Sequence, residues 1–394
     1  MSKNNKINKC SEVSGILGKG LYRIGIDNNR LVTGRTSRLI NRSSVTKRIA
    51  RKINSEIKLD FSDVLIVPKK SSLKSRKDTV LTREFYFKNS SQIWSGVPIA
   101  VSNMDTTGTI EMALELQQYK VLTCLHKYYN FSDIPANLDR DYFAISTGIS
   151  ESDIMKLDDT VNSIPDLRFI CVDVANGYMD SFVETCKFIR TKYPNKIIIA
   201  GNVVTPSQVT RLLRDARVDI VKIGIGSGSV CTTRLKTGVG YPQLSAILDC
   251  HIACRKNGGF LMSDGGIQTP GDLGKAFGAG ADFVMGGSLF AGHIESGGEM
   301  VEEEGVLYKI FYGMSSKRAM INHTGKMNSY RAEEGKVVKL KLRGHVNNTI
   351  NEYLGGLRST MTYVGTKYIS NLYKNVKFIK VNNQVNRIYN GQEL

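Results

Sequence analysis

The sequence predicts an α/β protein whose main part is a single-domain (β/α)8 barrel, the TIM-barrel fold. Eight short apolar runs rich in β-branched residues recur between residues 97 and 288, and segments with helical spacing lie between several of them. Strands that are buried on both faces read as continuous apolar runs, and eight parallel strands close this type of barrel. A doubly wound open sheet is the alternative, because a single sequence does not determine the number of strands.

Each predicted strand ends in small or polar residues, and helix-like segments follow. The predicted strands are 97–104, 121–127, 142–148, 168–176, 196–202, 219–226, 260–266 and 281–288. Helical spacing is present in 110–119, 181–192 and 206–216. Two helices have a recognisable start, because Thr205-Pro206 and Thr269-Pro270 each offer an N-cap followed by a proline in the first turn. The alternation of strand and helix favours a parallel sheet covered by helices.

Residues 1–57 differ in composition from the rest of the chain. They carry 13 Lys and Arg against 3 Asp and Glu, which is +10 of the formal net charge of +18. They are rich in Ser and Asn and lack sustained periodicity, which is typical of a disordered extension. A transit peptide and a nucleic-acid-binding arm are the alternatives. We therefore predict a basic, disordered extension over 1–57 and a barrel domain over 58–394, which begins with the apolar run 59–68.

The composition also disfavours several classes of protein. No run of about 18 apolar residues exists, so we expect no transmembrane helix, and no secretory segment follows the start. The seven cysteines are scattered without a Cys-x-x-Cys pair, which argues against a disulfide framework or a zinc site and favours a reducing compartment. We expect a cytoplasmic protein, with an organelle as the alternative. We expect no membrane partner, and nucleic acid is an unlikely one.

A glycine-rich loop after the sixth predicted strand carries the most reactive side chain. Gly224, Gly226 and Gly228 allow a sharp turn and a close approach to a ligand, and Cys231 follows them. A cysteine held among backbone N–H dipoles is favoured as a thiolate, the form that nucleophilic catalysis needs. An incidental small hydrophobic residue in a turn is the structural alternative.

The ends of the other strands are polar, as a barrel enzyme requires. Asp264, Gly265 and Gly266 end the seventh strand, and Gly286 and Gly287 end the eighth. The loops after these two strands commonly bind phosphate in barrels, and exposed N–H groups at paired glycines suit that role. The carboxylate of Asp264 is placed to accept hydrogen bonds from ribose hydroxyls. The residues therefore indicate an enzyme that binds a phosphorylated small molecule and uses a cysteine nucleophile, with a flavin-binding barrel as a further possibility.

Five motifs carry a resemblance to a known family. They are the run from Gly224 to Arg234, Lys236 to Ser245, Ser263 to Gly266, Phe311 to Ser316 and Tyr330 to Lys336. Together they resemble the IMP dehydrogenase/GMP reductase family over about residues 56–390. The short stretch between the second and fourth strands leaves no room for the regulatory domains of the dehydrogenases. The segment 322–329 also lacks their Arg-Tyr pair, so the reductases are the closer match.

The resemblance implies NADPH-dependent conversion of GMP to IMP and ammonia, a reaction of purine nucleotide salvage. It implies a covalent thioimidate at Cys231 and a proton-transferring dyad of Thr233 and Glu334. A dehydrogenase without regulatory domains is one alternative. A non-catalytic purine-nucleotide-binding protein with a nucleic-acid-binding extension is the other.

The resemblance also implies the ligand contacts and the assembly. The implied GMP contacts are Asp264, Gly265, Gly266, Gly286, Gly287, Met314, Ser315, Ser316, Arg331 and Gly335. The implied cofactor contacts are Ser75, Arg76, Lys127, Asp173, Val174, Ala175, Tyr330, Ser359, Thr360, Met361 and Thr362. A potassium site is implied at Gly226, Gly228, Cys231 and Arg234, and a homotetramer is expected.

Two positions depart from the reductase pattern, and one charge pattern bears on cofactor choice. Ser227 stands where reductases usually have proline, which would soften the cysteine loop. Glu333 stands where a serine is usual, which would add negative charge near an anionic ligand. Ser75, Arg76 and Lys127 could recognise a 2′-phosphate, which favours NADPH over NADH.

Overall fold

The structure, a computed structural model, describes residues 13–16, 21–27, 30–33, 40–41, 53–324 and 332–382. The chain separates into two compact units, Met1–Ile57 and Lys58–Leu394. In the first unit, β1 (Val13–Ile16), β2 (Leu21–Asp27), β3 (Arg30–Thr33) and β4 (Ile40–Asn41) form one antiparallel sheet. The expected disorder of this unit falls mostly outside the described residues, so its boundary and role stay predictions.

The second unit contains a closed barrel of eight parallel strands, which confirms the predicted fold. The strands are β7 (Gln92–Val101), β8 (Val121–Leu125), β9 (Phe143–Thr147), β10 (Phe169–Asp173), β11 (Ile197–Val203), β12 (Ile220–Ile223), β13 (Phe260–Asp264) and β14 (Phe283–Gly286). They pair in sequence order, and β14 pairs in parallel with β7. That last pairing closes the sheet and excludes the doubly wound alternative. All eight predicted strands are present.

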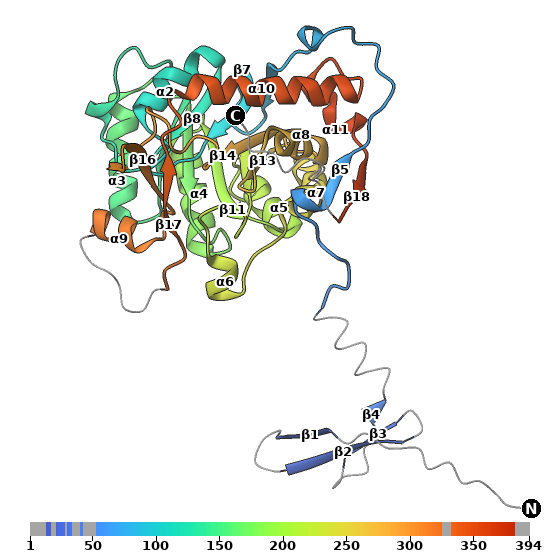
Figure 1. Cartoon of the computed structure of the whole chain (residues 1–394). Helices are drawn as coiled ribbons and strands as arrows, with labels where there is room; N and C mark the ends of the chain where they lie inside the picture. Colours follow the sequence, from blue (N-terminus) through green and yellow to red (C-terminus); the bar gives the residue numbers. More distant parts are fainter. Residues whose placement is uncertain are drawn as a thin grey trace, which may run out of the picture. The chain divides into compact units, whose positions relative to one another are not determined.

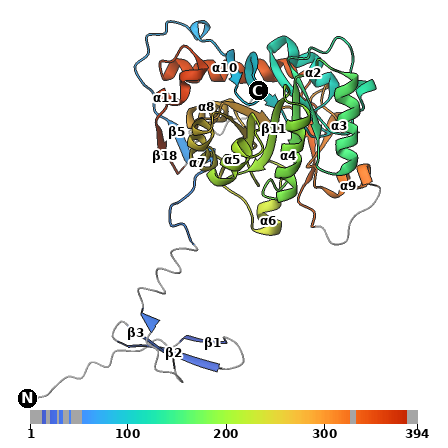
Figure 2. The ribbon, with the colours of Figure 1, turned by 180° about the vertical axis from the view of Figure 1, so that it is seen from behind.

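Helices surround the strands, as Figures 1 and 2 show from opposite sides. They are α2 (Ile110–Leu116), α3 (Glu151–Ser163), α4 (Asp180–Lys192), α5 (Pro206–Arg214), α7 (Gln243–Lys256), α8 (Pro270–Ala279) and α10 (Val346–Tyr363). Helix α10 packs against both α8 and α2, so it completes the outer ring near the point where the barrel closes. The other α-helices of this unit's described residues are α6 (Thr233–Thr237), α9 (Lys317–Thr324) and α11 (Leu372–Asn375).

The alternation of side chains along the strands separates two buried layers. One face packs outward against the helices, and the other face fills the inside of the barrel. β6 (Arg83–Phe87) forms an antiparallel hairpin with the N-terminal half of β7. Phe85 and Trp94 of this hairpin pack against Phe283 and Phe260, which are the first residues of β14 and β13. These rings therefore close the N-terminal end of the barrel.

A small antiparallel sheet lies between β14 and α10 in the chain. It consists of β15 (Met300–Glu303), β16 (Val306–Tyr312) and β17 (Val337–Lys341). The sequence analysis did not expect it. A second pairing joins β5 (Val64–Ile66) to β18 (Phe378–Lys380), so the two ends of the barrel unit are tied together. Within the described ranges, no helix is both long and apolar enough to span a membrane.

Candidate active site

The cysteine loop connects β12 to α6 and is shaped by its glycines. Gly224 and Gly226 have φ values of 156° and 76°, and a Cβ at Gly224 would lie 2.0 Å from the carbonyl oxygen of Asp264. Only glycine tolerates both the close approach and the left-handed backbone. The loop ends at Cys231, which forms an antiparallel bridge with Gly335. The sequence therefore folds this loop against a segment that lies about a hundred residues further along the chain.

Three side chains form a chain of hydrogen bonds at this bridge. The thiol of Cys231 lies 3.2 Å from Oγ1 of Thr233, and Thr233 donates to Oε2 of Glu334 at 2.7 Å. The backbone supports this geometry, because the N–H of Thr232 donates to the carbonyl of Glu334 at 2.9 Å. A carboxylate can thus exchange a proton with a group bound at the sulfur through one hydroxyl.

Beside the sulfur is a cavity of about 240 Å³ at the C-terminal end of the barrel. Of the predicted site residues, the cavity is lined by Asp173, Ala175, Gly226, Gly228, Cys231, Thr233, Asp264, Gly265, Met314, Ser315 and Glu334. The sheet of β15, β16 and β17 supplies the last part of this lining, since Met314 and Ser315 follow β16 and Glu334 precedes β17. Val174, Gly266, Gly286, Gly287, Ser316, Gly335 and Arg234 do not line it.

A buried lysine that the sequence analysis missed lines this cavity. Nζ of Lys222 forms an ion pair with Asp173 and a second one with Asp264 at 3.3 Å. Burial alone would lower the pKa of Lys222, but the charges of Asp173 and Asp264 outweigh it and raise the pKa well above its ordinary value. Lys222 is therefore a permanent cation that orients both carboxylates. Its position within an apolar strand was the available signal, because a lone charge there requires a partner.

The side chain of Asn202, which lines the cavity, has one acceptor without a hydrogen-bond partner among the described residues. Nδ2 of Asn202 donates to Asp264 at 2.8 Å and to the carbonyl of Gly224 at 2.8 Å. Its Oδ1 is buried and has no protein partner among the described residues. An orphaned buried acceptor is costly unless a ligand or water satisfies it, which supports a polar ligand at this point.

Comparison with known proteins identifies the family. The model of the IMP dehydrogenase / GMP reductase domain matches residues 58–387. The chain belongs to this family. A protein named GMP reductase from Caenorhabditis elegans is 52% identical over 344 residues, covering 86% of this chain and 96% of its own length. A GMP reductase from Escherichia coli strain K12 / DH10B is 51% identical over 346 residues, covering 86% of this chain and 99% of its own length.

Ser227 and Glu333 each make a hydrogen bond beside the site. Oγ of Ser227 donates to the carbonyl of Asp264 at 3.0 Å, which ties the cysteine loop to the end of β13. Oε1 of Glu333 accepts from the N–H of Lys317 at 3.0 Å and thus caps the first turn of α9.

Several other predicted cofactor residues in the described ranges lie away from this cavity. Ser75 and Arg76 belong to a short 3-10 turn that packs against α10, the helix that carries residues 359–362. Met361 is fully buried in the core, so its side chain is out of reach of a ligand. Tyr330 and Arg331 lie outside the described residues. Among the residues that the structure describes, no group of three His, Cys, Asp or Glu residues could hold a metal ion.

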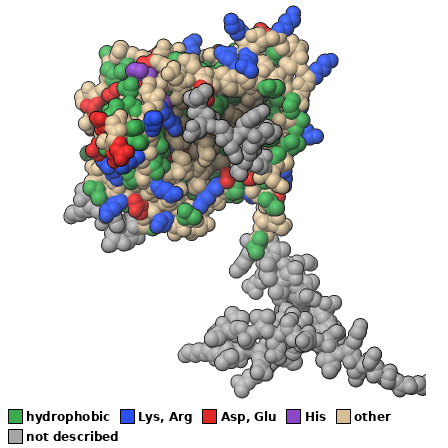
Figure 3. Space-filling model, viewed as in Figure 1, with side chains coloured by type: hydrophobic (Ala, Val, Ile, Leu, Met, Phe, Trp, Pro, Cys, Tyr) green, Lys and Arg blue, Asp and Glu red, His purple; other side chains and the backbone are tan. Residues whose placement is uncertain are grey.

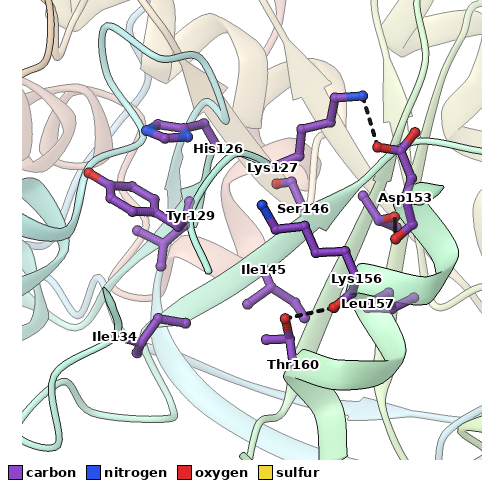
Figure 4. A pocket seen from close by; sticks show the side chains of 12 residues that line it. His126, Lys127, Tyr129, Ile134, Ile145, Ser146, Asp153, Lys156, Leu157 and Thr160 are labelled. Carbon is purple, nitrogen blue, oxygen red and sulfur yellow. Dashed lines mark hydrogen bonds and ion pairs between the residues drawn. The ribbon is translucent and has the colours of Figure 1, made fainter. Parts of the chain in front are cut away.

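Lys127 lines a different, smaller pocket at the C-terminal ends of β8 and β9. Figure 4 shows the side chain of Lys127 extending toward Asp153, whereas that of Lys156 extends toward Ser146. Nζ of Lys127 pairs with Asp153 at 3.0 Å, and burial lowers the pKa of Lys156. On the face of the barrel unit that Figure 3 shows, Lys and Arg side chains stand at several points around the central hollow. Such a distribution favours anionic ligands.

Proposed function

We propose that this chain is a GMP reductase, which uses NADPH to convert GMP to IMP and ammonia through a thioimidate at Cys231. The observation that carries the proposal is the continuous hydrogen-bonded series of Cys231, Thr233 and Glu334 at the wall of a nucleotide-sized cavity. The names of the relatives point to the same substrate.

The residues suit a two-step exchange at C2 of the purine. The thiolate of Cys231 adds to C2, and the bond from C2 to the exocyclic nitrogen breaks, so the nitrogen leaves as ammonia once it has received a proton. Glu334 delivers this proton through the hydroxyl of Thr233. A hydride then adds to C2, the carbon–sulfur bond breaks, and its electron pair returns to sulfur as the thiolate.

NADPH would supply the hydride when it is bound. A second cavity, of about 370 Å³, shares Ala175, Ile225, Thr233 and Glu334 with the first. Its other lining includes Tyr178, Val204 and Val239, which suit a planar, partly apolar group. NADPH is proposed over NADH because Ser75, Arg76 and Lys127 could recognise the 2′-phosphate.

The cysteine loop also suits a monovalent cation such as potassium. The carbonyl of Gly228 accepts a hydrogen bond from the N–H of Cys231 at 3.1 Å, which leaves a second lone pair for a cation. Backbone carbonyls would be the ligands at Gly226, Gly228, Cys231 and Arg234. Their role would be to hold the turn that presents the sulfur.

The test is a spectrophotometric assay with four mixtures of substrate and cofactor. GMP with NADPH should oxidise the cofactor and release ammonia, whereas GMP with NADH should react more slowly. IMP with NAD⁺ or NADP⁺ should not give steady turnover to XMP. Steady XMP formation would identify a dehydrogenase, and no reaction in any mixture would refute the proposal. A homotetramer and a cytoplasmic location stay predictions, which light scattering and fractionation would test.

A further inference from the structure

We propose that Asp60 is a positioning residue for the cysteine loop and that it acts through Arg234. The proposal rests on the function proposed above, and it assigns a role to a residue at the start of the barrel unit, far from Cys231 in the sequence. The structure supports it by a set of contacts that join Asp60 to the segment directly after the nucleophile.

The guanidinium of Arg234 is held from three sides. Its Nη1 donates to Oδ2 of Asp60 at 3.0 Å, and its Nη2 donates to the carbonyl of Tyr241 at 2.6 Å. Its stem lies between two glycines, because a Cβ at Gly226 or Gly240 would come within 2.6 and 2.5 Å of its Cγ. Arg234 directly follows Thr233, so the placement of its side chain constrains the hydroxyl that contacts Cys231.

Asp60 also connects this loop to the ends of two barrel strands. Its Oδ1 accepts from the N–H of Gln243 at 2.5 Å, at the start of α7. The side chain of Gln243 then donates to the carbonyl of Ile223 at 2.7 Å and to Oγ of Ser263 at 3.0 Å. One carboxylate therefore links the cysteine loop, the first turn of α7, and the strands β12 and β13 on either side of the site.

Asp60 is itself well anchored. Its N–H donates to the carboxylate of Asp63 at 2.7 Å, and the neighbouring Leu59 exchanges two hydrogen bonds with Ser245 at 2.8 and 3.0 Å. Phe61 is only 3% exposed and belongs to the core. The backbone that carries the Asp60 carboxylate is therefore held in place by these contacts, which is what a positioning group requires.

Because the ion pair of Asp60 and Arg234 is partly exposed, its loss should affect turnover more than the free energy of unfolding. The side chains of Arg234 and Asp60 are 37% and 35% exposed, and half-exposed ion pairs add little to the free energy of unfolding. Catalysis is more sensitive, because a displacement of about 1 Å at a reacting group can cost about a hundredfold in rate. Loss of the pair should therefore lower turnover while the folded state and the nucleotide cavity persist.

The test is the substitution Asp60→Asn, which keeps an acceptor for Gln243 but faces Arg234 with an amide. Turnover should fall by about ten- to a hundredfold, while the dissociation constant for GMP and the thermal midpoint stay close to those of wild type. The alkylation rate of Cys231 by iodoacetamide, followed by peptide mass spectrometry, should also change. The effects of Asp60→Asn and Arg234→Gln should be less than additive, because both break the same contact.

Arg211→Gln is the matched control, because it removes a similarly exposed ion pair, that of Arg211 on α5 with Asp180 on α4, outside the network of Asp60 and Arg234. It should leave turnover and alkylation unchanged. Unchanged turnover and alkylation in Asp60→Asn would overturn the proposal, as would a parallel loss of turnover, GMP affinity and thermal stability. If the wild-type chain does not reduce GMP, the proposed function fails, but the alkylation rates still decide whether Asp60 positions the loop.

Discussion

Replacement of Glu334 by glutamine separates the two chemical steps proposed for the site. Glutamine keeps the size of the side chain and an acceptor for the 2.7 Å hydrogen bond from Thr233, but it cannot supply a proton in the same way. Loss of ammonia needs a proton on the departing nitrogen, whereas hydride transfer to or from C2 does not. The two steps should therefore respond differently to this single change.

The expected magnitude follows from the loss of general acid catalysis at an otherwise intact site. Such catalysis contributes about 10²–10⁴-fold, which corresponds to about 2.7–5.5 kcal/mol in the activation free energy. Steady-state reduction of GMP should fall by that factor. In the reverse half-reaction, IMP and NADP⁺ form the thioimidate and NADPH without ammonia, so a stopped-flow burst of NADPH should fall by about tenfold or less.

Glu333→Gln is the matched control, because the neighbouring carboxylate caps α9 and does not contact Thr233. It should leave the ratio of the two rates unchanged. Equal losses of steady-state turnover and burst rate in Glu334→Gln would refute the assignment. Glu334 would then support nucleotide binding or loop geometry, and another group would donate the proton.

Four further results are expected. Cys231→Ala should bind GMP with an affinity within about 1 kcal/mol of wild type but show no NADPH oxidation; turnover above about a thousandth of wild type would exclude an obligatory thioimidate. Glu333→Ser should lower the KM for GMP, because removing a carboxylate near a helix N-terminus frees about 0.3–1 kcal/mol for an anionic ligand there; an unchanged KM would show that the phosphate lies elsewhere. Lys222→Met should lower the free energy of unfolding by about 3–5 kcal/mol in urea titrations, because it leaves two carboxylates without their buried cation; a loss under about 1 kcal/mol would mean that water already compensates them. Deletion of residues 1–57 should leave turnover within about twofold of that of the full chain, as expected for a charged extension outside a core. A truncated protein that is folded but inactive would show that the predicted domain boundary is wrong.

The barrel was predictable because its signal is local. Each strand is buried on both faces, so every one of the eight reads as an apolar run, and the β8 residues Val121 to Leu125 are all buried. The small sheet of β15, β16 and β17 was not predicted because β15 and β17 contain no buried residue and the pairing of β16 with β17 spans an interval of the chain that includes α9. The hairpin of β6 and β7 was missed for a related reason, since its aromatic residues find their partners only when the barrel closes.

At the site, the sequence identified reactive groups better than the contacts that orient them. Cys231 stands out because a reactive side chain follows three glycines, and the polar strand ends mark where a ligand could bind. The network around Lys222 and the contact between Asp60 and Arg234 join residues that are far apart in the chain. Such pairings depend on the closed barrel, and neither residue type nor spacing reveals them. The bond from Ser227 to Asp264 is of the same kind.

The aromatic rings that close the N-terminal end of the barrel limit where ligands can enter. Phe85, Trp94 and Phe283 pack across that end, and side chains fill the interior, so the barrel is a packed core and not a channel. Ligands therefore reach the proposed site from the loops at the opposite end. Since IMP would occupy the same cavity beside Cys231 as GMP, it should inhibit competitively against GMP.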